Sequence, residues 1–152
     1  MTSSVFHFVG DVVGKPRPRF NRMGTKVRTY TPKKGERFEK LVRDAYTAQC
    51  ETRYEGAVKV EIAYRRVLPK SRPKKTESER DLFKPDVDNV AKAVLDALNG
   101  VAFDDDKDVV SLKVGKLPRV RMDQDEMYVR VSDADDEEME EEWLRFTNST
   151  RL

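Results

Sequence analysis

Residues 84–100 read KPDVDNVAKAVLDALNG and contain the clearest periodic pattern in the chain. The apolar side chains in it recur at the spacing of one helix face, and they are Val87, Val90, Ala91, Val94, Leu95 and Leu98. Gly100 follows the last of them, where a glycine commonly ends a helix. The stretch therefore predicts an amphipathic helix over residues 87–98, whose outward face carries Asp88, Lys92 and Asp96.

The flanking sequence completes one small domain. Residues 34–49 repeat the helical spacing, and residues 5–13, 58–64, 110–114 and 127–131 have the apolar runs or alternation of strands. The chain has 152 residues, which is the size of a single domain. The order strand, helix, strand, helix, strand, strand predicts an α+β fold: a small mixed sheet of about four strands, covered on one face by two amphipathic helices.

The net charge of +2 is the sum of regions with opposite charge. Residues 133–152 hold eight acids and two bases, a net of −6, so residues 1–132 carry a net of +8. Residues 15–43 contain eleven bases against two acids, and residues 65–84 contain eight bases against three acids. Such basic segments favour a polyanionic partner. We expect a folded domain over 1–132 and an acidic tail over 133–152, either disordered or a short helix.

Several classes of protein are disfavoured by the composition. No apolar run approaches the roughly 18 residues of a membrane span, and residues 1–14 lack the pattern of a signal peptide, so a cytoplasmic protein is expected. The chain has one cysteine, Cys50, and one histidine, His7. These two exclude an internal disulfide and a zinc site built from several Cys or His ligands, and neither lies in a pattern that activates a Cys-His nucleophile.

Carboxylates gather at both ends of the predicted 87–98 helix. Asp86 and Asp88 stand at its start, and Asp104, Asp105, Asp106 and Asp108 follow its end. Mg²⁺ takes oxygen ligands and usually one or two carboxylates with waters and phosphate oxygens, so these acids could form a metal centre for phosphodiester hydrolysis, with Lys92 as a nearby cation. The structural alternatives are an N-cap for Asp86, an ion pair between Asp88 and Lys92, and a solvated turn over 104–106.

The segments KPDVDNVAK (84–92), DALNG (96–100) and DDKDV (105–109) together resemble the RusA family of Holliday junction resolvases, whose members are often carried by phages and prophages. The family pattern is D-x-D-N-x-x-K, then D-A-L, then D-D-x-Q-V, and Asp108 stands where the family has Gln. The similarity extends over residues 5 to about 130, and the acidic tail has no counterpart in the pattern.

The resemblance implies a homodimer that needs Mg²⁺, with Mn²⁺ as a possible substitute, and that resolves four-way DNA junctions by paired symmetric nicks in recombination and repair. Asp86, Asp88 and Asp106 match the catalytic and metal-binding acids, Lys92 matches the catalytic lysine, and Asp105 is a supporting metal ligand. The cations expected to contact DNA are Lys15, Arg17, Arg19, Arg22, Lys26, Arg28, Lys84 and Lys116, and Phe20 or Tyr30 is a candidate to stack or wedge at the crossover.

Three other functions remain open at this point. The chain could hold branched or single-stranded DNA without cleaving it, or it could be a nuclease for flaps or linear DNA. It could also be a structural scaffold whose carboxylates serve as caps and ion pairs. For the acidic tail, a DNA mimic that competes for the basic surface is an alternative to a solubilising segment, and its apolar residues would let a short helix dock on the body or on a partner.

Overall fold

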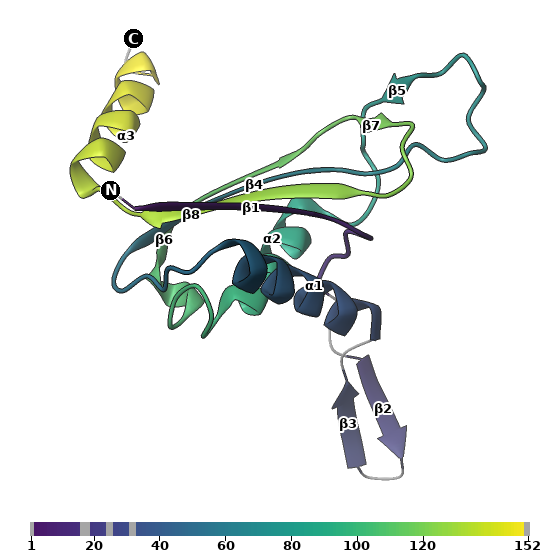
Figure 1. Cartoon of the computed structure of the whole chain (residues 1–152), viewed down its shortest axis with the longest axis horizontal. Helices are drawn as coiled ribbons and strands as arrows, with labels where there is room; N and C mark the ends of the chain where they lie inside the picture. The colour runs from purple at the N-terminus through teal and green to yellow at the C-terminus, as the bar shows by residue number, and fades with distance from the viewer. Residues whose placement is uncertain (1, 16–18, 24–25, 31–32, 151–152) are drawn as a thin grey trace.

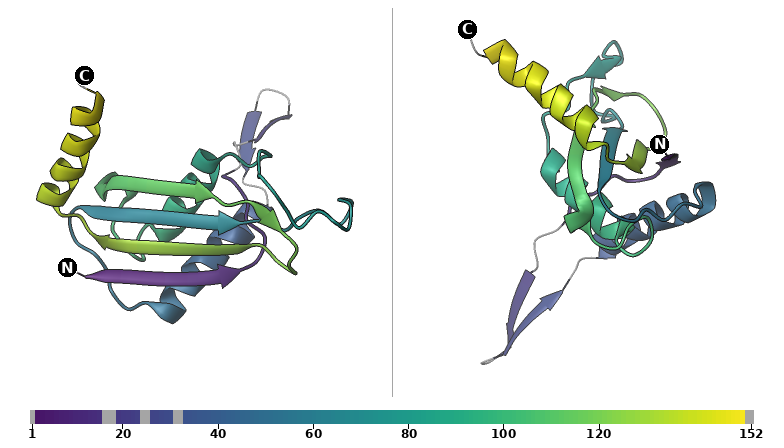
Figure 2. Two further views of the ribbon diagram at one scale, coloured as in Figure 1. Left: turned by 90° about the horizontal axis from the view of Figure 1, so that it is seen from above. Right: turned by 90° about the vertical axis from the view of Figure 1, so that its left-hand side faces the viewer.

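The computed structural model describes residues 2–15, 19–23, 26–30 and 33–150, of which 19–23, 26–30 and 150 are described by their backbone. Four strands form one sheet in the order β1-β8-β4-β6 (Figure 2). They are β1 (Ser3–Val9), β4 (Val58–Arg65), β6 (Val109–Lys116) and β8 (Glu126–Asp133). β8 is antiparallel to both β1 and β4, whereas β4 and β6 are parallel, so the sheet is mixed.

Two helices, α1 (Lys33–Gln49) and α2 (Val87–Leu98), lie against one face of this sheet, and the other face is left open (Figure 1). α2 lies between β4 and β6 in the chain, because a parallel pair needs a crossover connection rather than a tight turn. The α+β fold with a small mixed sheet covered by two amphipathic helices is confirmed.

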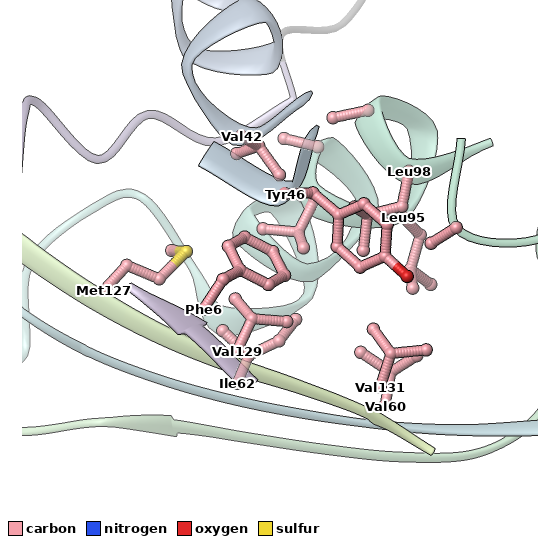
Figure 3. Close-up of a cluster of buried hydrophobic side chains, with 14 of the residues drawn as sticks. Phe6, Val42, Tyr46, Val60, Ile62, Leu95, Leu98, Met127, Val129 and Val131 are labelled. Carbon is pink, nitrogen blue, oxygen red and sulfur yellow. The ribbon is translucent and has the colours of Figure 1, made fainter. Parts of the chain in front are cut away.

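The core fills the space between the sheet and the two helices (Figure 3). Alternate residues of β1, β4 and β8 point toward the helices and are buried, as the period of two requires. Phe6 is wholly buried, and its ring meets that of Tyr46 on α1 edge to face, with the centroids 5.4 Å apart. α2 adds a nearly continuous buried face, from Val90 to Leu98.

The first strand is shorter than the sequence predicts. The predicted strand runs over residues 5–13, but β1 begins at Ser3 and ends at Val9. Gly10 has φ +148, a backbone conformation that side-chain-bearing residues rarely adopt, and a Cβ there would lie 2.6 Å from Leu41 Cδ2. The chain therefore leaves the sheet at Gly10 and passes across the start of α2.

Four short strands, one 3-10 turn and a third helix complete the described chain. β2 (Arg19–Met23) and β3 (Lys26–Tyr30) pair as an antiparallel hairpin beyond the body of the domain, so the basic segment that follows β1 is not a simple loop. β5 (Ser78–Glu79) pairs with β7 (Arg119–Val120), and the single turn η1 (Asp106–Asp108) leads into β6. The acidic segment forms α3 (Asp136–Thr150). None of the helices in the described ranges has the length and apolar character needed to cross a bilayer.

Candidate functional site

Asp86 and Asp88 stand at the amino terminus of α2, where backbone N–H groups lack helical partners and favour negative charge. Asp86 has the extended backbone of an N-cap residue, with φ −71 and ψ 153, but its side chain accepts no capping hydrogen bond. Both residues are exposed, and neither carboxylate has a hydrogen bond or ion pair among the described residues. The capping role for the Asp86 side chain and the Asp88–Lys92 pair are therefore both absent, and two carboxylates are free to bind a ligand.

Lys92 forms ion pairs both with Asp106, which follows α2, and with an acid on α2 itself. Its Nζ lies 2.9 Å from Asp106 Oδ2 and 3.0 Å from Asp96 Oδ1, one turn further along α2. Hydrogen bonds to Asp106 and then to Asp96 raise the pKa of Lys92 above its ordinary value, so the ammonium stays protonated. The structure thus brings together Lys92 and Asp106, which are 14 residues apart in the sequence.

The acids of residues 104–106, which the sequence does not distinguish, have different partners. Asp104 Oδ1 accepts a hydrogen bond from Arg53 Nη2 at 2.6 Å. Asp105 caps the turn η1 by accepting the Lys107 N–H at 3.0 Å, and this backbone hydrogen bond is the main reason why the pKa of Asp105 is lowered. Asp106 alone of these three pairs with Lys92 in the described structure. The geometry therefore favours Asp106 as the acid that acts with α2, while Asp105 shapes the turn.

The predicted metal ligands are not gathered into one group. Within the described ranges, no three Asp, Glu, His or Cys side chains lie close enough to hold a metal ion together. Asp106 contacts Lys92 instead, through its Oδ2 atom. Asp86 and Asp88 by themselves supply the one or two carboxylates that Mg²⁺ usually takes from protein, so the donor set fits a hydrated divalent cation.

A cleft of about 700 Å³ opens beside Asp86. Its charged lining residues are three bases and one acid: Lys15, Lys34, Lys84 and Asp86. One wall of the cleft forms where the segment that follows β1 passes across the start of α2. There the Lys15 N–H donates to Asn89 O at 2.8 Å, and a Cβ on Gly14 would lie 2.7 Å from Pro85 Cβ. A cleft with this lining can accept a phosphate chain beside the free carboxylates.

Lys15 is held by acids rather than left free for a ligand. Its Nζ lies 2.6 Å from Glu39 Oε1 on α1 and 3.0 Å from Asp96 Oδ2 on α2. Burial by itself lowers the pKa of Lys15, but the hydrogen bonds and charges of Glu39 and Asp96 outweigh burial, and the pKa is raised. Asp96 therefore joins Lys15 to Lys92, and a continuous set of ion pairs runs from α1 to η1.

A buried ion pair, between Asp81 and Arg66, supports the loop that leads into Asp86. Asp81, whose side chain is wholly buried, accepts two hydrogen bonds from Arg66, both at 2.7 Å. Arg66 also donates to the Lys84 carbonyl at 2.7 Å, and Lys116 Nζ donates to the Phe83 carbonyl at 2.6 Å. Lys116 and Arg66 thus act on the loop backbone, and the side chain of Lys84 is exposed at the cleft.

Two exposed apolar side chains in this loop were missed in the sequence. Leu82 is 79% exposed and Phe83 46% exposed, only four and three residues before Asp86. The Arg119 guanidinium lies 4.5 Å from the centroid of the Phe83 ring. A Leu-Phe pair inside a basic, otherwise polar stretch is the signal that would have identified them. Such side chains can stack on or separate bases.

Tyr64 lies beneath the same loop. Its hydroxyl is buried and has no hydrogen-bond partner among the described residues. Burial raises the pKa of Tyr64 to about 12, and Asp81 and Asp86 act in the same direction. The Tyr64 phenol is therefore uncharged at any ordinary pH. The negative charge of the nearby carboxylates is balanced by the cations of the loop.

The other predicted DNA contacts belong to the segment between β1 and α1. Arg17 lies outside the described residues, as do the side chains of Phe20, Tyr30, Arg19, Arg22, Lys26 and Arg28, although the backbone of the last six belongs to the β2–β3 hairpin.

A Cys-His nucleophile is not formed: the Cys50 sulfur lies 3.7 Å from the Val5 carbonyl oxygen, and the His7 ring stacks on Tyr128. Burial raises the pKa of the Cys50 thiol, which disfavours the reactive thiolate.

Comparison with known proteins shows the family to which this chain belongs. A family model described as "Endodeoxyribonuclease RusA" matches residues 10–132, which include the residues that line the cleft, α2, η1, β4, β6 and nearly all of β8, but not β1. A protein of Bacillus subtilis (strain 168), named "Uncharacterized protein YqaN", is 37% identical over 130 residues, which cover 77% of this chain and 92% of that protein. The match begins at Gly10 and ends at Ser132, before α3. The chain belongs to the RusA family of endodeoxyribonucleases.

Proposed function

We propose that this chain resolves four-way DNA junctions as a metal-dependent homodimer, by paired symmetric nicks. The observation that supports it best is the position of Asp86 and Asp88, two free carboxylates at a helix terminus beside a cleft lined by lysines. A structural acid would be paired or would cap the helix, and a surface that only binds DNA needs no carboxylates at its centre. The family membership supports cleavage of DNA, and the choice of a four-way junction is the proposal.

Each side chain has a distinct role in this proposal. Asp86 and Asp88 hold Mg²⁺, with Asp106 as a further ligand or as the anion that orients Lys92. When bound, the metal lowers the pKa of water and offsets the negative charge of the scissile phosphate. Lys92, kept protonated by Asp106 and Asp96, offers its ammonium to a phosphate oxygen or to the leaving group.

The surroundings of the site provide the contacts to DNA. Lys84, and Lys34 on the first turn of α1, follow the phosphate backbone along the cleft, and the β2–β3 hairpin extends the basic surface. Phe83 stacks on a base that a branched junction leaves unpaired, and Leu82 inserts beside it as an apolar wedge. Two copies related by a two-fold axis present two such sites to the two equivalent strands of a symmetric junction. We place the catalytic domain over residues 1–132 and treat α3 as an addition to it.

The test is cleavage of a mobile four-way junction, a flap and a linear duplex, with and without Mg²⁺. We expect symmetric nicks on the junction that require Mg²⁺ and disappear in Asp88→Asn. Asp44→Asn is the matched control, because Asp44 is an exposed acid on the helix α1 that pairs with Lys40. This variant should cleave the junction as wild type does. Binding without cleavage in any metal identifies a junction-binding protein instead, and equal cleavage of the flap or linear duplex rejects junction specificity.

A further inference from the structure

Four of the eight bases in residues 65–84 have no role in the active site. Three of the eight pair with acids, namely Arg65, Arg66 and Arg72, and Lys84 lines the cleft. The other four are exposed and form no ion pair among the described residues: Lys70, Lys74, Lys75 and Arg80. Unpaired cations gathered on one surface favour a polyanionic partner.

These four bases lie on a loop and a short strand pair that extend past the end of the sheet. We call this part of the chain the basic arm and define it as residues 69–80 and 119–121, which include β5 and β7. Figures 1 and 2 show it at the end of the sheet opposite α3. The acidic helix of the same chain therefore does not neutralise the cations of the arm.

The backbone of the basic arm is braced by internal hydrogen bonds. The Arg121 guanidinium donates to the Pro73 carbonyl at 2.7 Å and to the Thr76 carbonyl at 3.1 Å. Two turns are closed by the backbone, since the Arg72 N–H donates to the Pro69 carbonyl and the Thr76 N–H to the Pro73 carbonyl. A braced loop loses little conformational freedom when it binds, so its cations are preorganised for a ligand.

The charge of the basic arm is strongly positive. The arm contains seven bases and two acids, a net of +5. One of the two acids, Glu79, contacts both Arg72, at 2.8 Å, and Arg119, at 3.3 Å. Every residue of the arm is described, and Glu77 is its one exposed acid. The four exposed bases therefore face solvent with little compensating charge.

The basic arm leads directly to the lysine-lined cleft. Residues 81–83 separate Arg80, at the end of the arm, from Lys84 in the cleft lining. The buried pair of Asp81 with Arg66 fixes this connection, since Arg66 also donates to the Lys84 carbonyl at 2.7 Å. A phosphate chain that leaves the cleft on the Lys84 side therefore meets the cations of the arm next.

The residue types of the basic arm indicate which form of DNA it takes. The arm contains no aromatic residue, whereas surfaces for single strands stack successive bases on aromatic side chains. Lysine, serine and threonine side chains contact phosphates, and phosphate contacts carry no sequence information. We propose that the basic arm binds the phosphate backbone of the duplex that leaves the active-site cleft. The proposal rests on the proposed function and deepens it, because it assigns the duplex beyond the branch point to a named surface.

The test measures binding without cleavage. The affinity for a four-way junction and for a linear duplex is measured in EDTA over a range of KCl concentrations. Lys74→Gln/Lys75→Gln removes two exposed bases, so the slope of log K against log[KCl] should become shallower by about 1.8, because each phosphate contact contributes about 0.9. Since the contact is with duplex backbone, this change should be the same on the junction and on the linear duplex.

Two further double variants isolate the contact. Lys59→Gln/Lys113→Gln is the matched control: it removes the same charge from the open sheet face, outside both the arm and the cleft, and its slope should equal that of wild type. Lys74→Arg/Lys75→Arg keeps the charge of the arm and should recover the wild-type slope. A loss in this arginine variant as large as in the glutamine variant would contradict an electrostatic contact and overturn the proposal.

Other outcomes also overturn it. Equal slopes for wild type and Lys74→Gln/Lys75→Gln on both probes mean that the arm does not contact DNA. A change on the junction alone means that the lysines act at the branch point rather than on duplex. Nicking of the junction by wild type in Mg²⁺ is measured separately. Nicking with equal slopes rejects the arm and leaves the proposed function intact, whereas shallower slopes on both probes without nicking support the arm and reject junction resolution.

Discussion

Replacing Asp81 by asparagine tests the buried ion pair that supports the loop before Asp86. The Asp81 side chain is wholly buried, and the Arg66 side chain is 13% exposed. Their two hydrogen bonds, both 2.7 Å long, are the charge-assisted, bidentate kind. The substitution Asp81→Asn keeps the shape of the side chain but leaves the guanidinium buried without its counter-charge.

Removing one partner of a buried ion pair costs about 3–5 kcal/mol of unfolding free energy. We expect Asp81→Asn to lie near the lower end, at about 3 kcal/mol, because the amide oxygen can still accept one hydrogen bond. Asp44→Asn is the matched control: its pair with Lys40 has the same charge but side chains that are 70% and 63% exposed, and such i,i+4 pairs contribute about 0.3–0.5 kcal/mol. Urea unfolding at pH 7, followed by circular dichroism, measures both.

The dependence on pH has a definite sign. Burial by itself raises the pKa of Asp81, but hydrogen bonds from Arg66 and from the Phe83 N–H outweigh it and hold the pKa below its ordinary 3.8. The ion pair therefore stabilises the fold above about pH 4, the range in which the unfolded carboxyl is ionised, and this contribution is lost as the pH falls through the lower folded pKa. The difference between wild type and Asp81→Asn should shrink in acid. Equal midpoints for Asp81→Asn and Asp44→Asn at pH 7, or a difference that does not change with pH, would refute the reasoning.

Three further substitutions probe the core, the cleft wall and the charge of Lys92. Phe6→Ala removes a wholly buried ring and should lower the unfolding free energy by about 3–5 kcal/mol in urea; a loss below about 1 kcal/mol would contradict the described core. Gly14→Ala places a Cβ 2.7 Å from Pro85 Cβ and should cost about 1–3 kcal/mol while weakening junction binding in a gel-shift assay; unchanged stability and binding would mean that the crossing is loosely packed. Asp96→Asn removes one of the two acids that raise the pKa of Lys92. If cleavage needs the protonated Lys92 ammonium, the loss of cleavage rate at alkaline pH should then begin at a lower pH than in wild type. A pH–rate profile that does not move would argue against this role of Lys92.

The motif residues predicted the site in part. Their spacing placed Asp86 and Asp88 at the start of a helix and Lys92 one turn along it, because a helical period is a local property. The sequence did not distinguish Asp104, Asp105 and Asp106, since their roles depend on partners that are distant in sequence: Arg53 for Asp104 and Lys92 for Asp106. Leu82 and Phe83 were missed for the same reason, because exposure depends on what the folded chain leaves uncovered.

The sequence by itself determined the two helices, the four main strands and the α+β class, because apolar periods of 3.6 and 2 are set by the backbone of each segment. It also separated a basic body from an acidic segment. Tertiary structure decided the strand order β1-β8-β4-β6, the end of β1 at Val9, just before Gly10, and the ion pairs from Glu39 through Lys15, Asp96 and Lys92 to Asp106. It also decided that α3 stands beside an open sheet face with its apolar side chains uncovered. These features depend on which distant segments pack together, and that is a property of the whole chain rather than of any window within it.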